Sequence, residues 1–162
     1  MSLNQQSKEN SVSKIDIVIN FMHAMESEHF NVARELTSND FIFEDPSGSK
    51  FDINYFINVH SPLITACQPW TFGMSNFRDN KNSVFFVSQI RAKHTKDLIH
   101  SILGIKMRAT NININLPKMS VTCKFSDEKI AYLKVSAPKD GGLSGLLHQI
   151  GYKKTQIEHP KD

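Results

Sequence analysis

Apolar residues in the first part of the chain recur at helical spacing. Between Lys14 and Glu28 they stand three or four positions apart, which predicts an amphipathic helix. A second, shorter helix is expected after Asn31, whose side chain suits the N-cap position. Asp52 is the expected N-cap of a third helix, and Pro62 should kink or divide that helix. The inward residues predicted for the third helix are Phe56, Val59 and Leu63.

From Trp70 onward the pattern changes from helical spacing to alternation, which is typical of strands. The segment 84–94 is the clearest strand, and its inward face is predicted to carry Val84, Phe86, Ser88, Ile90, Ala92 and His94. Two further alternations, over 112–116 and 119–125, are offset by one residue. This offset predicts a bulge or bend at 116–118.

The remaining elements are a short strand at 41–44, a last strand at 129–137 and a helix at 143–150. Helices first and antiparallel strands afterwards predict an α+β fold, with helices packed on one face of a strongly curved antiparallel sheet. A length of 162 residues suits one domain. We expect a flexible segment over 1–13, a single domain over 14–151 and a polar tail over 152–162.

Charge and composition exclude several classes of partner. The net charge of +3 comes from scattered residues, whereas nucleic-acid binding needs a basic patch. No apolar run approaches the roughly 20 residues of a membrane span, and the first residues lack the apolar part of a signal peptide. A cytoplasmic protein without nucleic-acid or membrane partners is therefore expected. Cys67 and Cys123 lack the spacing of a metal site, and Cys123 is predicted to be a buried free thiol.

The segment 43–49, Phe-Glu-Asp-Pro-Ser-Gly-Ser, carries the leading candidate for chemistry. Pro46 restricts Asp45 to an extended conformation, and Gly48 permits a sharp turn after it. A carboxylate held at a strand end beside a core can act as a general base. The alternative is an Asx-turn, in which Asp45 accepts from the backbone N–H of Ser47 or Gly48.

Histidines supply the other candidates. His94 falls on the inward strand face, where it is either an acid or hydrogen-bond donor for catalysis or a satisfied core histidine. His60 borders the apolar face of the third helix, at a pocket rim or in solvent. His23, Glu26 and His29 fall short of a metal site, so neither a metal nor a cofactor is expected.

Three stretches resemble one family. They are similar to the SnoaL-like polyketide cyclases of the nuclear transport factor 2-like superfamily: FIFEDPSGS at 41–49, the stretch from Lys93-His94-Thr95 through Gly104 to Ile130, and GLSGLLHQIG at 142–151. This superfamily includes ketosteroid isomerase. The resemblance implies a cone-shaped fold with a cavity, in which Asp45 stands at the position of the isomerase's catalytic aspartate. It also implies a homodimer. The outward residues Phe85 and Val87 are candidates for its interface, and the alternative for them is local packing under the terminal helix.

The same resemblance shows what this chain lacks. Phe21 and Val121 stand where the isomerases carry their two oxyanion donors, and the loss of one such donor costs about 3 kcal/mol of transition-state stabilisation. The expected ligand is a small hydrophobic carbonyl compound. Two functions remain open: proton abstraction leading to isomerisation or aldol-type cyclisation, with Asp45 and His94 as catalytic residues, and a non-catalytic binding or dimeric interaction module. Residues expected to line the cavity are Phe21, Met25, Tyr55, His60, Trp70 and Val121.

Overall fold

A computed structural model describes residues 12–153, so the predicted flexible segment 1–13 and the polar tail 152–162 fall mostly outside the described residues. The first part of the chain forms α2 (Lys14–Glu26), α3 (Phe30–Glu35), β1 (Thr37–Glu44), β2 (Lys50–Phe51) and α4 (Ile53–Ala66). The second part forms β3 (Met74–Asn80), β4 (Ser83–Ser88), β5 (Arg91–Lys93), β6 (Leu98–His100), β7 (Ile105–Met107), β8 (Asn113–Asn115), β9 (Met119–Ser126), β10 (Lys129–Ser136) and α5 (Gly142–Gln149).

Side-chain caps account for where two of the helices begin. The Ser13 hydroxyl accepts from the backbone N–H of Asp16 at the start of α2. At α4 the carboxylate of Asp52 accepts from the N–H of Tyr55 at 2.9 Å, as predicted. The prediction for Asn31 was wrong, because α3 begins two residues earlier than predicted, at Phe30, and His29 occupies its N-cap. Pro62 lies within α4 without dividing it.

The α+β class is confirmed, but the main sheet is mixed rather than antiparallel. Its six strands lie in the order β2-β1-β10-β9-β4-β3, and β1 runs parallel to β10 with Phe43 opposite Leu133. The other strand pairs in this sheet are antiparallel. The alternation of apolar residues cannot reveal this arrangement, because it is the same whichever strand lies alongside.

Two neighbouring long strands are interrupted at adjacent positions in the sheet. The predicted break at 116–118 is present, and it separates β8 from β9. The segment predicted as one strand over 84–94 is also interrupted, between β4 and β5. The two breaks meet, since the N–H of Leu116 donates to the carbonyl of Ile90 at 3.0 Å. Beyond this line β5 and β8 form a separate two-stranded sheet, and β6 pairs with β7 in another.

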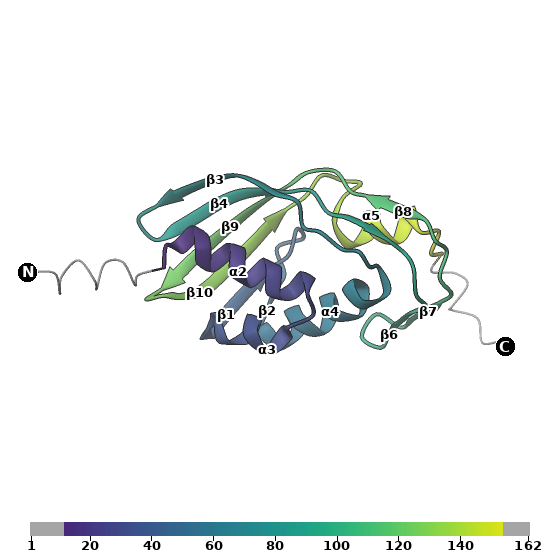
Figure 1. Cartoon of the computed structure of the whole chain (residues 1–162), viewed down its shortest axis with the longest axis horizontal. Helices are drawn as coiled ribbons and strands as arrows, with labels where there is room; N and C mark the ends of the chain where they lie inside the picture. The colour runs from purple at the N-terminus through teal and green to yellow at the C-terminus, as the bar shows by residue number, and fades with distance from the viewer. Residues whose placement is uncertain (1–11, 154–162) are drawn as a thin grey trace, which may run out of the picture.

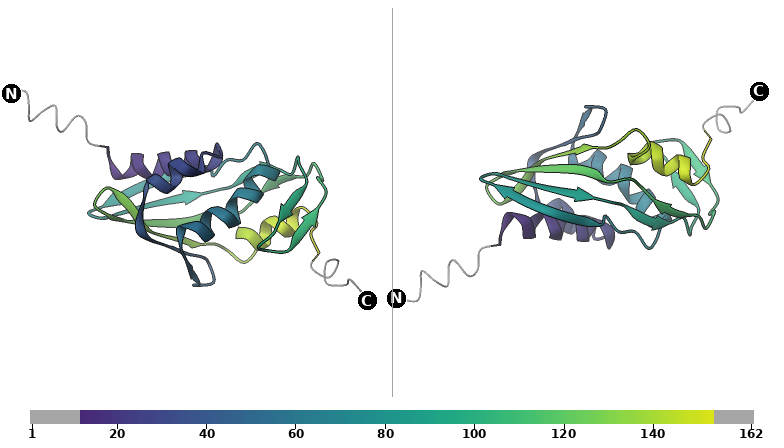
Figure 2. Two further views of the ribbon diagram at one scale, coloured as in Figure 1. Left: turned by 90° about the horizontal axis from the view of Figure 1, so that it is seen from below. Right: turned by 90° about the horizontal axis from the view of Figure 1, so that it is seen from above.

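The helices pack against the curved sheet around a cluster of phenylalanines. Figure 1 shows α2 in front of the long strands with α3 and α4 below it, and Figure 2 shows α2 lying along one face of the strands. The ring of Phe56 lies 5.6 Å from that of Phe21, 6.0 Å from that of Phe41 and 4.9 Å from that of Phe43. These contacts fix α4 across the sheet. α5 lies at the end of the molecule away from the start of α2 (Figure 1).

A glycine within α5 permits its close approach to the preceding chain. A Cβ atom placed on Gly145 would lie 2.8 Å from the carbonyl carbon of Asp140 and closer still to its oxygen. These are backbone atoms, so the chain itself has to move to admit a side chain. Next to Gly145, Leu146 is almost completely buried.

We therefore expect Gly145→Ala to destabilise the protein. Overpacking costs about 1–3 kcal/mol, which exceeds the roughly 1 kcal/mol that alanine gains over glycine in a helix. Urea unfolding measures the difference. The matched control is Ser144→Ala at the adjacent exposed position, where no loss is expected. An alanine at 145 that leaves stability unchanged would show that α5 is not held by this contact.

Candidate functional site

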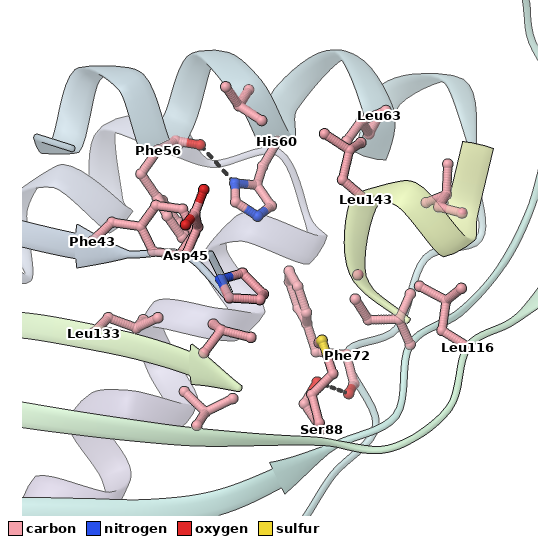
Figure 3. A pocket seen from close by; sticks show the side chains of 18 of the residues that line it. Phe43, Asp45, Phe56, His60, Leu63, Phe72, Ser88, Leu116, Leu133 and Leu143 are labelled. Atoms are coloured by element: carbon pink, nitrogen blue, oxygen red, sulfur yellow. Dashed lines mark hydrogen bonds between the residues drawn. The ribbon is translucent and has the colours of Figure 1, made fainter. Parts of the chain in front are cut away.

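A cavity of about 160 Å³ lies between α4, α5 and the sheet, and Figure 3 shows it from close by. Most of its wall is apolar and comes from the sheet, from the inner face of α4 and from the start of α5. The lining residues that are partly or fully exposed mark its mouth, between the β1–β2 turn, α4 and the junction of β10 with α5: Asp45, Pro46, Tyr55, His60, Val135, Gly142 and Leu143.

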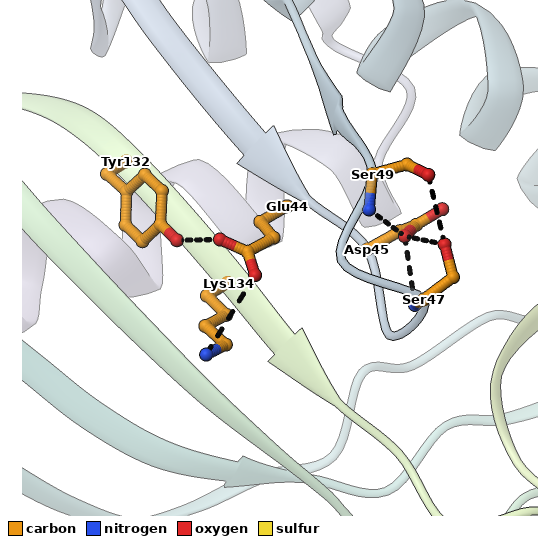
Figure 4. A network of polar contacts seen from close by, with 6 residues as sticks. All are labelled: Glu44, Asp45, Ser47, Ser49, Tyr132 and Lys134. Atoms are coloured by element: carbon orange, nitrogen blue, oxygen red, sulfur yellow. Dashed lines mark hydrogen bonds and ion pairs between the residues drawn. The ribbon is translucent and has the colours of Figure 1, made fainter.

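Asp45 lies at this mouth and also forms the predicted turn. Its Oδ1 accepts from the backbone N–H groups of Ser47 and Ser49, both at 3.0 Å, and from the hydroxyl of Ser47 at 2.6 Å (Figure 4). Gly48 adopts a φ of 90°, which supplies the left-handed residue that the turn requires. One carboxylate oxygen is therefore committed to holding the β1–β2 turn.

His60 reaches from α4 to the mouth of the cavity beside Asp45 (Figure 3). Its Nδ1 lies 2.7 Å from the carbonyl oxygen of Phe56, one helical turn earlier. The imidazole also packs on the rings of Phe43 and Phe56, at 5.8 and 4.3 Å between ring centres. Burial lowers the pKa of His60, the bond to the Phe56 carbonyl partly opposes this, and nearby His100 lowers the pKa further. Neutral imidazole is thus favoured.

His94 does not line the cavity, so the structure does not bring it together with Asp45. The side chain is completely buried, and its Nδ1 lies 2.9 Å from the hydroxyl of Thr110 and 3.3 Å from the backbone nitrogen of that residue. Burial lowers the pKa of His94. The alternation that predicted a shared face continues past the strand break, beyond which the chain has left the main sheet.

The residues expected to bind ligand fall into two groups. Tyr55, His60, Trp70 and Val121 line the cavity together with Asp45. Phe21 and Met25 do not line it, although both are completely buried. Phe21 instead packs against Phe41 and Phe56 in the helix–sheet core.

Sequence reasoning missed the cavity role of Ser88. Its hydroxyl, completely buried, lines the cavity and donates to the carbonyl of Phe72 at 2.6 Å (Figure 3). The sequence did contain an indication of this role, because a serine stands among apolar residues on the inward face of β4. Leu143 and Leu146 of α5 also line the cavity, and nothing in their local pattern indicates where α5 packs.

A second polar group lies on the opposite face of β1 and β10. The hydroxyl of Tyr132 donates to Glu44, and the ammonium group of Lys134 lies 3.9 Å from the same carboxylate (Figure 4). The hydrogen bond to Glu44 raises the pKa of Tyr132 to about 12, with smaller contributions from burial and from the carboxylate charge. This group holds the outer face and does not contact the cavity.

The candidate metal residues do not form a site. Glu26 accepts from the backbone N–H of Phe72 at 2.7 Å, so its carboxylate anchors the chain before β3. Within residues 12–153 no cluster of three histidine, cysteine, aspartate or glutamate side chains is arranged to hold a metal ion. Each helix in that range is too short or too polar to cross a lipid bilayer. Cys67 and Cys123 are buried free thiols, and burial raises their pKa values to about 11 and about 12.

Comparison with known proteins gives matches in structure alone, since no family model and no curated protein sequence matches the chain. IdmH, a proposed polyketide cyclase from Streptomyces antibioticus, superposes with a TM-score of 0.67 at 16% identity, covering 87% of this chain and 100% of IdmH. A protein with a ketosteroid isomerase-like fold from Catenulispora acidiphila gives 0.62 at 12% identity, with coverages of 85% and 94%.

A third neighbour shows how widely the chemistry varies on this architecture. An epoxide hydrolase from M. tuberculosis, described as LEH-like, superposes with a TM-score of 0.61 at 11% identity, covering 85% of this chain and 91% of that protein. Identities this low establish a shared fold without a shared reaction. The resemblance seen in the sequence is therefore supported at the level of the fold, and the chain has the nuclear transport factor 2-like, ketosteroid isomerase-like fold.

Proposed function

We propose that this chain is a SnoaL-like protein that binds a small hydrophobic carbonyl compound in the cavity between α4, α5 and the sheet. The observation that carries the proposal is the cavity itself, with an apolar wall and a few polar side chains near its mouth. Such a combination is typical of small-molecule sites, in which apolar surface supplies affinity and a few polar groups fix orientation. The structural neighbours of this chain include proposed polyketide cyclases, which supports the proposal.

The volume of the cavity limits the size of the ligand. A closed apolar cavity of about 150 Å³ holds a molecule as large as benzene, whereas sites for drug-sized ligands measure about 300–1,000 Å³. At about 160 Å³ this cavity accommodates one ring or a short branched chain. A polycyclic compound would have to extend through the mouth.

Binding without turnover is better supported than catalysis by Asp45. Its Oδ1 is committed to the turn, His94 lies elsewhere, and Phe21 and Val121 carry no donor at the positions of the isomerases' oxyanion groups. The hydroxyl of Tyr55 at the mouth is a side-chain donor that a ligand carbonyl can reach. Proton abstraction remains the second candidate, because the other oxygen of Asp45 has no hydrogen-bond partner among the described residues.

Filling the mouth should weaken binding. We expect Leu143→Phe to raise the dissociation constant of a monocyclic ketone such as cyclohexanone at least tenfold, because the larger ring occupies ligand space. Trp70, the only tryptophan in the sequence, lines the cavity, so its fluorescence reports occupancy. Ser144→Phe at the neighbouring exposed position is the control and should bind normally. Equal binding by both variants would place the ligand outside this cavity.

Substitution of Asp45 separates its structural role from a catalytic one. We expect Asp45→Ala to lose about 1 kcal/mol of stability, since the N–H groups of Ser47 and Ser49 lose their acceptor. Asp45→Asn keeps an acceptor oxygen and should retain both stability and ligand affinity. Unfolding and binding titrations measure these effects.

The second candidate function has its own readout in the same variants. Exchange of ligand protons beside the carbonyl, followed by NMR in deuterated water, measures proton abstraction. If the wild-type protein accelerates this exchange and Asp45→Asn does not, Asp45 is a base and binding without turnover is wrong.

We also propose that the outer face of the sheet forms a homodimer. Phe85 and Val87 are partly buried on this face, and they line a shallow groove with Ser120 and Thr122. A second copy would cover these apolar side chains.

Phe85→Glu should therefore convert a dimer to a monomer, because a buried unpaired carboxylate is costly in an apolar interface. Sedimentation equilibrium measures the change in mass. Asn82→Glu, in the exposed turn between β3 and β4, should leave the dimer intact. A wild-type protein that sediments as one chain contradicts the dimer.

A further inference from the structure

The polar side chains of the cavity wall share one property, which is that nearly all of them accept hydrogen bonds. Four lining residues other than Trp70 carry a polar side chain: Asp45, Tyr55, His60 and Ser88. Three of these groups, Asp45, His60 and Ser88, form hydrogen bonds with other parts of the protein. These bonds show which lone pairs remain for a ligand.

His60 is the clearest case. The carbonyl oxygen of Phe56 can only accept, so the proton in their 2.7 Å contact belongs to Nδ1 of His60. In neutral imidazole the second nitrogen, Nε2, then carries a lone pair and no proton. Figure 3 shows this nitrogen on the cavity side of the ring, and no partner for it is found among residues 12–153. The lowered pKa of His60 favours the neutral form.

Ser88 and Asp45 extend the same pattern. The Ser88 hydroxyl gives its proton to the carbonyl of Phe72, so only oxygen lone pairs remain for a ligand. Asp45 acts as an acceptor in its own turn, where Oδ1 accepts from three donors.

Two side chains of the cavity wall carry hydrogen-bond donors. The Tyr55 hydroxyl lies at the mouth, as His60 does, and it can either donate or accept. The indole N–H of Trp70 is itself buried and has no partner in the described part of the chain. Val121, which lines the cavity and stands at the position of one oxyanion donor in the isomerases, offers none.

We propose that the cavity selects a hydrophobic ligand with a hydroxyl group, and that Nε2 of His60 accepts the hydrogen bond from this group. The proposal rests on the proposed binding function and specifies the polar group that is recognised, which is a hydroxyl group; a carbonyl compound presents one when it binds as its enol. An alcohol, a phenol or the enol form of a carbonyl compound satisfies it. A ligand whose only polar group is an acceptor leaves the lone pair of His60 without a partner.

Matched probes of one size test this selection. Phenol and toluene differ by a hydroxyl in place of a methyl group, and both suit a cavity of about 160 Å³. We expect the wild-type protein to bind phenol about five- to tenfold more tightly than toluene, the ratio that one added hydrogen bond supplies. Cyclohexanone, an acceptor, should bind no more tightly than toluene.

His60→Phe is the variant that removes the acceptor, since phenylalanine can keep the ring packing against Phe43 and Phe56. It should lose the preference for phenol over toluene, so that the ratio of the two dissociation constants falls to about one. His60→Gln restores an acceptor oxygen and should recover part of that preference. Circular dichroism checks that both variants fold.

Nitrogen NMR of labelled histidine in the wild-type protein gives a readout that does not depend on any variant. Nδ1 of His60 should carry the proton, and the Nε2 resonance should move on addition of phenol and stay in place on addition of toluene. A proton on Nε2, or equal affinity for phenol and toluene, overturns this inference while leaving the binding function intact. If none of the three probes binds, both the inference and the proposed binding function fail.

Discussion

The parallel pairing of β1 with β10 is the constraint on which the cavity depends. It places strands from the two ends of the domain side by side, with Phe43 opposite Leu133 and Glu44 opposite Lys134. Because side chains alternate across a sheet, one register delivers an apolar pair to the cavity wall and a charged pair to the outer face. The hydrogen bond from Tyr132 to Glu44 reinforces this register from outside. A shift by one residue would carry charge into the cavity.

The bend in the sheet gives the cavity its second boundary. Where β4 ends and β9 begins, the sheet is interrupted, and α5 occupies the space left beside the main sheet. The close approach of Gly145 to Asp140 allows Leu146 to reach the cavity wall. The mouth therefore lies between two short chain segments, the β1–β2 turn and the start of α5, and neither is held in the centre of a sheet.

Local features of the fold were predictable from the sequence, whereas long-range ones were not. Helical spacing, the Asp52 cap and the buried face of β4 follow from residues close together in the chain. The parallel strand and the break before β5 depend on which segments meet in space. The same distinction applies to the site. Trp70 and Phe21 are both buried apolar residues, but only the position of α4 and α5 decides that Trp70 lines a cavity.

The cavity wall draws on residues from Met22 in α2 to Leu146 in α5, so no fragment of the chain contains it whole. Contacts between segments this far apart in sequence form late and slowly during folding, because closing the intervening loops costs entropy. A compound that binds in this cavity therefore binds the folded domain and not the unfolded chain. Its binding free energy would therefore add to the stability of the whole domain rather than to that of one element. Occupancy of the cavity and persistence of the folded chain are, in this architecture, thermodynamically linked quantities.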